Sequence, residues 1–361
     1  MNLHILVLPG DGIGEEVTRE AVRVLDAVCR KFGHSVKLTD GLLGGIAIHK
    51  TGTPLPEETR KLALDADATL MGAVGLPEFD NVPPEKRPEK GLLGIRQALG
   101  VFANLRPVRA YSALIDSSPL KNHLVEGTDM IIVRELTGGL YYGTPRGISG
   151  SGNDEHAVNT MSYTRPEIER VSRMAFHLAR GRRKKVTSVD KSNVLENSQL
   201  WRKVVTEVAA EFPDVALDHL LVDNCAMQLV LNPKRFDVIV TENMFGDILS
   251  DEGAVLAGSI GMLPSASIGG KKPSGAWVGL YEPVHGSAPD IAGQNKANPL
   301  GAIGSVAAML EYSFGLTKEA ASVNRAMEAV LESGKVTADL RPKGSPATTE
   351  QVGQAVCDSL A

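Results

Sequence analysis

Short apolar runs alternate with amphipathic segments along most of the chain, and this alternation limits the possible folds more than any other feature of the sequence. Residues 3–8 are mostly apolar and end at Pro9-Gly10, which is typical of a buried strand. Residues 15–32 carry apolar side chains at helical spacing. Further strands are expected at 35–39, 68–72, 130–133, 185–189, 216–222 and 236–240, and further helices at 57–64, 197–212 and 225–231. Repeated strand–helix units predict an α/β fold around a largely parallel sheet.

Composition excludes several classes of protein. The chain has 361 residues, 43% hydrophobic and 22% charged, which is enough to build the cores of about two domains and argues against disorder. Its net charge of -5 gives no general attraction to nucleic acid or to an anionic membrane. No apolar run approaches the roughly 18 residues of a membrane span, and residues 3–8 are too few for a signal-peptide core. Three sparse cysteines, Cys29, Cys225 and Cys357, suit a reducing cytoplasm.

Two stretches interrupt the alternation. Residues 78–90 are rich in proline and mixed charge, which indicates a surface loop. Residues 138–154 are rich in Gly, Ser and Tyr, which is compatible with a β-hairpin arm that projects from the body.

Residues 10–14, with the sequence GDGIG, imitate a dinucleotide-binding fingerprint because they follow a strand and open a helix. The third glycine of that fingerprint would fall at Glu15, however. A tight turn whose glycines adopt positive φ is the better interpretation.

Asp247 and Asp251 lie four residues apart just after the strand expected at 236–240, so they share one face of a helix that begins there. Two like charges on one face repel unless a cation lies between them, and their oxygens suit Mg²⁺ or Mn²⁺. A third carboxylate, Asp223, also directly follows a strand. A solvated acidic face explains the same pair equally well.

Three arginines form a possible anion site. Arg96 and Arg106 are ten residues apart, and Arg134 ends the apolar strand at 130–133. Guanidinium groups bind carboxylates in a bidentate manner, so three that converge would suit a small polycarboxylate. Surface arginines at the ends of elements are the alternative.

Two further residues are candidates for proton transfer. Tyr141 lies within the glycine-rich stretch, and Lys191 follows the strand at 185–189. A lysine beside other cations has its charged form disfavoured and can act as an acid or base near neutral pH. A loop aromatic and a solvated lysine are the alternative interpretations.

The loop at 282–293 combines Gly and Pro with His285 and Asp290. Such a loop can present backbone N–H groups to phosphates. An acidic residue there would accept hydrogen bonds from a ribose diol and repel a 2′-phosphate.

Taken together, these motifs resemble those of the β-decarboxylating dehydrogenases, the family of isocitrate and isopropylmalate dehydrogenases. The matching stretches are 10–14 (GDGIG), 134–139 (RELTGG), 188–191 (SVDK), 243–251 (NMFGDILSD), 285–293 (HGSAPDIAG) and 297–299 (ANP). The resemblance implies a two-domain fold of this family's type with a mostly parallel central sheet, which is not a true Rossmann fold. It places residues 1–101 and 256–361 in the first domain, and 102–255 in the second, with an arm at about 138–160.

The resemblance also implies roles for individual residues. Arg96, Arg106 and Arg134 would hold the malate carboxylates, and Tyr141 and Lys191 would be the acid–base pair. Asp247 and Asp251 would bind the metal together with Asp223, and the second subunit of a homodimer would donate both Asp223 and Lys191. Substrate contacts would also come from Asp223, Glu89, Leu92, Leu93 and Val194. The cofactor would contact His285, Gly286, Ser287, Ala288, Pro289, Asp290, Ile291 and Asn298.

The implied reaction is NAD-dependent oxidative decarboxylation of (2R,3S)-3-isopropylmalate to 4-methyl-2-oxopentanoate, CO₂ and NADH in leucine biosynthesis, with Mg²⁺ or Mn²⁺. The segment 87–93 (RPEKGLL) matches the isopropylmalate type, and Asp290-Ile291 matches the NAD type. An enzyme acting on D-malate, tartrate or homoisocitrate, a non-catalytic regulatory subunit and a Mg²⁺-dependent phosphoryl-transfer enzyme are the alternatives. Residues 76–80, 150–155 and 274–279 depart from the family pattern outside the implied catalytic set.

Overall fold

The computed structural model describes residues 1–256, 258–272 and 276–360. It divides into two compact units. Unit 1 comprises 1–101, 110–119 and the part after residue 257, and unit 2 comprises 102–109 and 120–256. Residues 110–119 therefore belong to unit 1, whereas the sequence expectation assigned them to the second domain. Of the atypical stretch 274–279, Ser274 and Gly275 lie outside the described residues.

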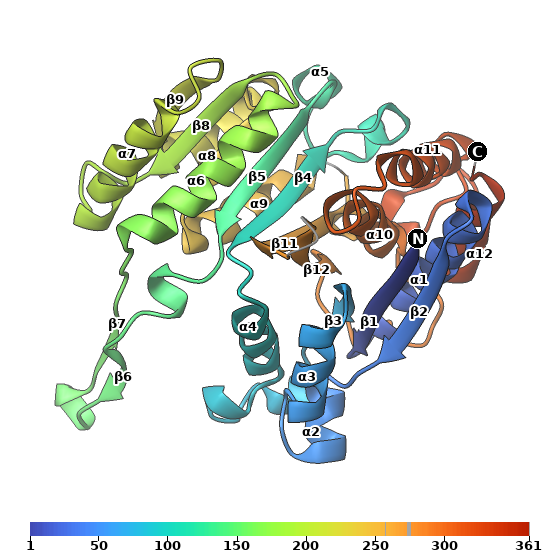
Figure 1. Ribbon diagram of the computed structural model, residues 1–361, viewed down its shortest axis with the longest axis horizontal. Coiled ribbons are helices and arrows are strands. Elements are labelled where there is room, and N and C mark those ends of the chain that lie inside the picture. Colours follow the sequence, from blue (N-terminus) through green and yellow to red (C-terminus); the bar gives the residue numbers. More distant parts are fainter. Residues whose placement is uncertain (257, 273–275, 361) are drawn as a thin grey trace. The chain divides into compact units, whose positions relative to one another are not determined.

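Unit 1 contains five adjacent strands in the order β2-β1-β3-β12-β11. Neighbours in this series are parallel except for β11 and β12. The strands are β1 (Asn2–Gly10), β2 (Ser35–Asp40), β3 (Ala68–Ala73), β11 (Pro264–Lys271) and β12 (Trp277–Pro283). The helices are α1 (Gly14–Phe32), α2 (Gly45–Thr51), α3 (Glu57–Asp65), α4 (Pro88–Leu99), α10 (Leu300–Tyr312), α11 (Thr317–Ser333) and α12 (Thr349–Asp358). Helix α10 is buried along nearly all of its length because it packs between the sheet, α1 and α11 (Figure 1).

Unit 2 contains strands in the order β4-β5-β10-β8-β9, in which only β4 and β5 are antiparallel. The strands are β4 (Ala103–Arg109), β5 (Asp129–Glu135), β8 (Lys185–Asp190), β9 (Ala216–Leu221) and β10 (Val238–Thr241). The helices are α5 (Asn122–Val125), α6 (Arg165–Arg180), α7 (Glu196–Ala209), α8 (Val222–Leu231) and α9 (Asn243–Leu256). Helices α6 and α7 pack on one face of the strands, and α8 and α9 pack on the other (Figure 1). The expected mostly parallel α/β architecture is confirmed.

An antiparallel hairpin of β6 (Arg146–Ser149) and β7 (His156–Asn159) extends from the rest of unit 2 (Figure 1). Every residue of both strands is exposed. The atypical residues 150–155 form its turn, where Gly150 has φ +89° and a Cβ atom would lie 2.1 Å from the carbonyl oxygen of Asp154.

The sequence expectation for residues 78–90 was partly wrong. A short 3-10 helix (Pro77–Phe79) begins within the atypical stretch 76–80, and a second one spans Pro84–Lys86. Helix α4 then begins at Pro88. Proline is favoured at the first helical position because its fixed φ suits the helix and its missing N–H would have had no partner there. The proline that suggested a loop therefore starts a helix.

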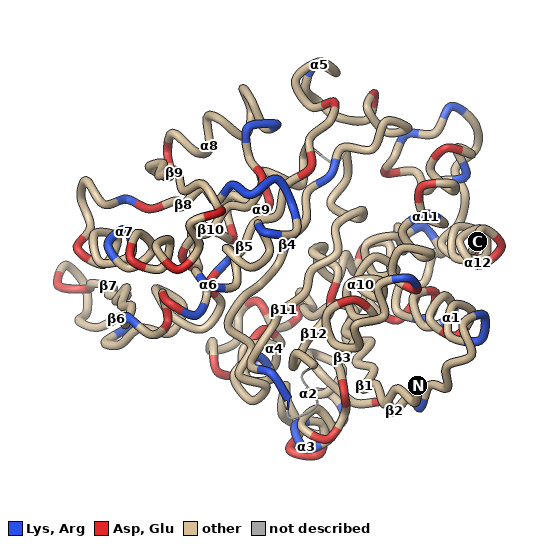
Figure 2. Tube along the Cα trace, turned by 45° about the horizontal axis from the view of Figure 1, so that its top comes forward, with Lys and Arg blue, Asp and Glu red and all other residues tan. Residues whose placement is uncertain are grey.

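Opposite charges are paired where the chain is most basic. Arg180 and Arg182 belong to a run of cations between α6 and β8 (Figure 2). Arg180 pairs with Asp214 at 2.7 Å, and Arg182 pairs with Asp129 at 2.7 Å and with Asp237 at 2.9 Å.

Within the described part of the chain, no helix has the length and apolar character that a membrane span requires.

Candidate active site

The centre of the candidate site in unit 2 is a close approach of α9 to β5. Gly246 lies against Arg134, and a Cβ atom at Gly246 would be 2.7 Å from both Cβ and Cγ of Arg134. This contact brings Asp247, the next residue of α9, onto the Arg134 guanidinium, and the two form an ion pair. The Arg134 side chain is only 4% exposed, so Asp247 helps to compensate a positive charge that is largely removed from water.

We expect Gly246→Ala to destabilise unit 2 because the added methyl group would force α9 away from β5. Overpacking of this kind costs about 1–3 kcal/mol, and thermal unfolding measures it. Gly253→Ala on the same helix is the matched control, since a Cβ there would meet only side-chain methyl groups, of Val108, Ile132 and Met130, at 3.1, 3.5 and 3.8 Å. Equal melting temperatures for the two variants would contradict the account of this contact.

Arg106 joins the same group of charges from β4. Its guanidinium lies 3.5 Å from the Asp247 carboxylate and 3.1 Å from that of Asp251. Its Nε donates to the Asn104 side chain at 2.8 Å, and its Nη1 donates to Ser250 Oγ at 2.5 Å. Asp247 and Asp251 share a face of α9 as the sequence predicted, and both lie beside arginines, although the Asp251 side chain is 60% exposed.

Tyr141 reaches this cluster from the 3-10 helix Gly139–Tyr141. Its hydroxyl donates to Asp247 Oδ2 at 2.8 Å, and the Arg134 guanidinium lies 5.6 Å from the centre of its ring. Burial, together with the neighbouring Asp247 carboxylate, raises the pKa of Tyr141 to about 12. Tyr141 therefore keeps its proton at neutral pH.

A buried network beside the cluster was missed by the sequence analysis. The Glu242 carboxylate accepts the backbone N–H groups of Met244 and Phe245 at the start of α9, at 3.0 and 2.7 Å. The Tyr163 hydroxyl donates to Glu242 at 3.2 Å and accepts the backbone N–H of Asn243 at 2.9 Å. Burial raises the pKa of the Glu242 carboxyl group. The network fixes the first turn of the helix that carries the aspartates.

Lys191 and Asp223 lie together, but apart from this cluster's carboxylates. Their side chains form an ion pair of 3.0 Å, and this pairing lowers the pKa of Asp223. Asp223 lies in the first turn of α8, which begins earlier than the sequence suggested. Val194 nearby in the sequence is 61% exposed. Among the described residues, no three His, Cys, Asp or Glu side chains are arranged to hold a metal ion, so one chain does not gather the three predicted aspartates.

Arg96, the third predicted arginine, belongs to unit 1. On α4 its Nη2 pairs with Glu282 of β12 at 2.5 Å, and both side chains are less than 10% exposed. Its Nε is buried without a hydrogen-bond partner among the described residues. The same helix carries Glu89, which is exposed, and the half-buried Leu92 and Leu93.

The turn at 10–14 supports the loop at 285–293 within unit 1. Gly10 and Gly12 have φ of +74° and +56°, which confirms the turn interpretation. The Ile13 N–H donates to the Ser287 carbonyl at 2.8 Å, and a Cβ atom at Gly12 would lie 2.1 Å from that oxygen. Buried Asp11 accepts the backbone N–H groups of residues 45, 46 and 75, each at 2.8 Å.

The loop itself carries most of the predicted cofactor residues. His285 is buried, its Nδ1 lies 2.9 Å from the Gly286 carbonyl oxygen, and its Nε2 has no partner among the described residues. Burial lowers the pKa of His285. Asp290 is exposed, and buried Asn298 accepts the Leu300 N–H at 3.0 Å. The remaining predicted contacts are Gly286, Ser287, Ala288, Pro289 and Ile291, which belong to the same loop.

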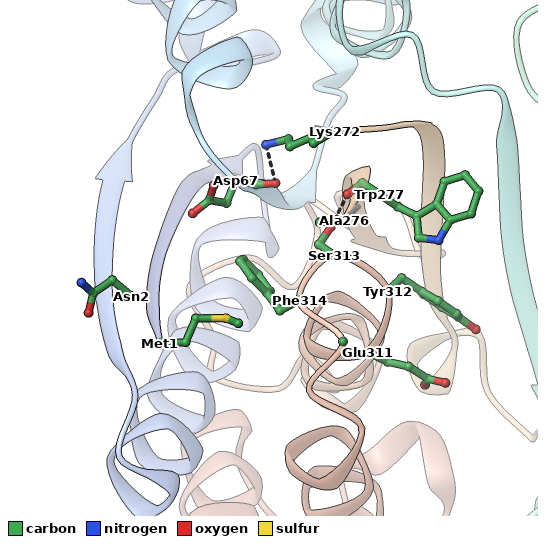
Figure 3. Close-up of a pocket in the computed structure, with 11 residues that line it drawn as sticks. Met1, Asn2, Asp67, Lys272, Ala276, Trp277, Glu311, Tyr312, Ser313 and Phe314 are labelled. Carbon is green, nitrogen blue, oxygen red and sulfur yellow. Dashed lines mark hydrogen bonds between the residues drawn. The ribbon is translucent and has the colours of Figure 1, made fainter. Parts of the chain in front are cut away.

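A separate cavity of about 550 Å³ lies in unit 1 at the amino-terminal ends of β1, β3 and β12 (Figure 3). Two of its polar side chains bond to the backbone: Lys272 Nζ donates to the carbonyl oxygens of residues 66 and 67, and Ser313 Oγ donates to the Trp277 carbonyl. None of the predicted site residues lines it.

Comparison with known proteins agrees with these motifs. Residues 4–356 match the family model described as isocitrate/isopropylmalate dehydrogenase. The chain is 59% identical to a 3-isopropylmalate dehydrogenase of Geobacillus kaustophilus, over 100% of this chain and 97% of that one. It is 56% identical to the enzyme of that name from Aquifex aeolicus, over 94% and 92%. Among solved structures, isocitrate dehydrogenase from Methylococcus capsulatus matches with a TM-score of 0.87 and 36% identity, over 99% of both chains.

Proposed function

Because the chain belongs to the isocitrate/isopropylmalate dehydrogenase family, we propose that it catalyses NAD-dependent oxidative decarboxylation of (2R,3S)-3-isopropylmalate. The products are 4-methyl-2-oxopentanoate, CO₂ and NADH, and the reaction serves leucine biosynthesis in the cytoplasm. The observation that carries the proposal is the cluster of Arg106, Arg134 and Tyr141 on Asp247 and Asp251. The two arginines can bind a dicarboxylate, the tyrosine can donate a proton, and the aspartate oxygens can bind a metal ion.

Arg106 and Arg134 bind the substrate carboxylates. Both guanidinium groups are largely buried, and their present partners are carboxylates, the same group that the substrate would offer. Arg96 has a buried Nε without a partner among the described residues, which suits it for a further contact with the substrate. On the same helix as Arg96, the half-buried Leu92 and Leu93 offer apolar side chains suited to the isopropyl group. Glu89, and Val194 of a second chain, are the further substrate contacts in this proposal.

The donor set at Asp247 and Asp251 fits Mg²⁺ or Mn²⁺, since hard divalent cations prefer carboxylate oxygens. Two aspartates are too few on their own, and Asp223 completes the set from a second chain. When bound, the cation stabilises negative charge on the substrate oxygen as a Lewis acid during decarboxylation.

Two side chains of the protein move protons in the proposed reaction. Lys191 in its neutral form accepts the proton of the C2 hydroxyl group during oxidation and becomes the ammonium, and Tyr141 donates a proton to C3 after CO₂ leaves. The raised pKa of Tyr141 suits this order because the residue enters the reaction protonated. Lys191 belongs to the second chain in the same way as Asp223, its partner in the ion pair.

The loop at 285–293 suits NAD. Buried His285 leaves Nε2 without a partner among the described residues, which is the polar atom that a bound nucleotide would satisfy. Exposed Asp290 would accept hydrogen bonds from a ribose diol and repel the 2′-phosphate of NADP. NAD held by this loop would supply the hydride acceptor for oxidation at C2.

Exposed apolar side chains support a homodimer with shared sites. Met227 and Leu231 on α8 are 57% and 59% exposed, and Ile248 on α9 is 60% exposed. These two helices pack together and carry the aspartates proposed for the metal. Burying such residues against the same face of a second copy is favourable and would bring the two sets of aspartates together.

A spectrophotometric assay tests the proposed function. NADH formation from 3-isopropylmalate is expected with Mg²⁺ or Mn²⁺ and NAD, to be lost with a chelator, and to be much slower with NADP. D-malate, tartrate, isocitrate and homoisocitrate are the comparison substrates. Faster turnover of any of these would overturn the choice of substrate, and no turnover of any of them would favour a regulatory subunit.

A further inference from the structure

The side chain of Asn243 joins two parts of unit 2 that the proposed reaction uses together. Its Oδ1 accepts the Arg134 Nε–H at 2.9 Å, and its Nδ2 donates to the Gly138 carbonyl at 3.0 Å. Arg134 is the proposed carboxylate ligand, and Gly138 directly precedes the short helix that ends at Tyr141. We propose that Asn243 is a positioning residue; this rests on the proposed function. It holds Arg134 and residues 138–141, called the Tyr141 segment below, in fixed positions relative to α9.

Asn243 is itself held rigidly. It is 1% exposed, and its backbone N–H donates to the Tyr163 hydroxyl at 2.9 Å. The Tyr163 side chain lies directly against the Tyr141 segment: a Cβ atom at Gly138 would be 2.7 Å from its ring, and one at Gly139 would be 2.3 Å from its hydroxyl oxygen. The Asn243 side chain is therefore fixed in place, and both its oxygen and its NH₂ group form hydrogen bonds.

The Tyr141 segment has local anchors, since the Gly138 N–H donates to the Glu135 carboxylate at 2.8 Å and the Gly139 N–H donates to the Ser162 carbonyl at 3.1 Å. Neither of these two bonds reaches α9. The hydrogen bond from Tyr141 to Asp247 does reach α9, but it ends on a proposed cation ligand. The bond from Asn243 to Gly138 is a connection that does not involve that ligand.

Asn104 supplies a matched comparison. Its Oδ1 accepts the Nε–H of Arg106 at 2.8 Å, just as Asn243 does for Arg134. Asn104 lies on β4, opposite Arg134 on β5, whereas Asn243 also holds the Gly138 carbonyl. Loss of Asn104 should therefore weaken substrate binding, and loss of Asn243 should in addition impair the chemical step.

Steady-state kinetics of Asn104→Ala, Asn243→Ala and the isosteric Asn243→Asp test the proposal. Asn104→Ala is expected to raise KM for 3-isopropylmalate with kcat within about twofold of wild type. Both Asn243 variants are expected to lower kcat by about tenfold or more. Asn243→Asp should raise KM less than Asn243→Ala, because its carboxylate still accepts from Arg134 but cannot donate to Gly138.

A crystal structure of Asn243→Asp gives a readout that does not depend on activity, and displacement of Tyr141 with α9 in place is expected. A kcat within about twofold of wild type for both Asn243 variants, or an unmoved Tyr141, would overturn the proposal. A wild-type protein that does not turn over 3-isopropylmalate would refute the proposed function instead, and the crystal structure would still decide whether Asn243 holds the segment.

Discussion

Lys191→Ala is expected to lower kcat by about 10²–10⁴-fold, the range that a positioned acid or base contributes. The reason is that the C2 hydroxyl group would lose the side chain proposed to accept its proton. Lys191 directly follows β8 and pairs with Asp223 at 3.0 Å, so its removal leaves the Arg134–Asp247 cluster of its own chain intact. NAD affinity, measured by fluorescence titration, is therefore expected to change little.

Lys185→Ala is the matched control for this prediction. Lys185 begins β8, the strand that Lys191 follows, and lies 3.9 Å from Asp218, which is also acidic. Its removal should leave kcat unchanged. Near-normal turnover of Lys191→Ala would remove Lys191 from the mechanism, and equal losses in both variants would point to a general effect of losing a lysine at either end of β8.

Asp247→Asn is expected to lower kcat/KM by at least about 10²-fold, because a metal that stabilises charge contributes several kcal/mol. Asp247 is the common partner of Arg134, Arg106 and Tyr141. The amide would remove a cation ligand and leave the buried Arg134 charge without its carboxylate. Activity as a function of Mn²⁺ concentration, and the rise in melting temperature with Mn²⁺, measure the two consequences.

Asp251→Asn separates these consequences. Asp251 is 60% exposed and pairs with Arg106, whereas Asp247 is 33% exposed and pairs with both Arg106 and Arg134. Both variants should bind Mn²⁺ more weakly, but only Asp247→Asn should also lower the melting temperature without metal. Wild-type stabilisation by Mn²⁺ in both variants would contradict the assignment of the metal to these residues.

Local patterns in the sequence predicted most of the elements that matter. The apolar run at 3–8 forms β1, and the segment with helical spacing after residue 14 forms α1. Both were predictable because the spacing of apolar residues in a strand or helix depends only on residues close together in the sequence. The spacing of Asp247 and Asp251 predicted their shared face for the same reason. The start of α4 at Pro88 was missed because proline both ends and begins helices, and composition alone does not distinguish the two.

Long-range contacts in the site could not be predicted in this way. Tyr163 bonds to Glu242 and to Asn243 across about 80 residues of chain, and neither partner's local sequence indicates the other. The pairing of Arg134 with Asp247 likewise depends on the approach of α9 to β5 at Gly246. Asn243 lay inside a motif that the sequence identified, but only the fold shows that its amide bridges Arg134 and Gly138.

A site shared between two chains is the central claim, and mixing two inactive variants tests it most directly. Lys191→Ala and Asp247→Asn subunits are dissociated, combined in equal amounts and reassembled. In a mixed dimer, the intact Asp247 of one chain would meet the intact Lys191 of the other, which restores one of the two sites. Random pairing makes about half of the dimers mixed, so the account predicts recovery of about one quarter of wild-type activity. Recovery no greater than the sum of the two separate variants, with mixed dimers shown to form, would contradict it.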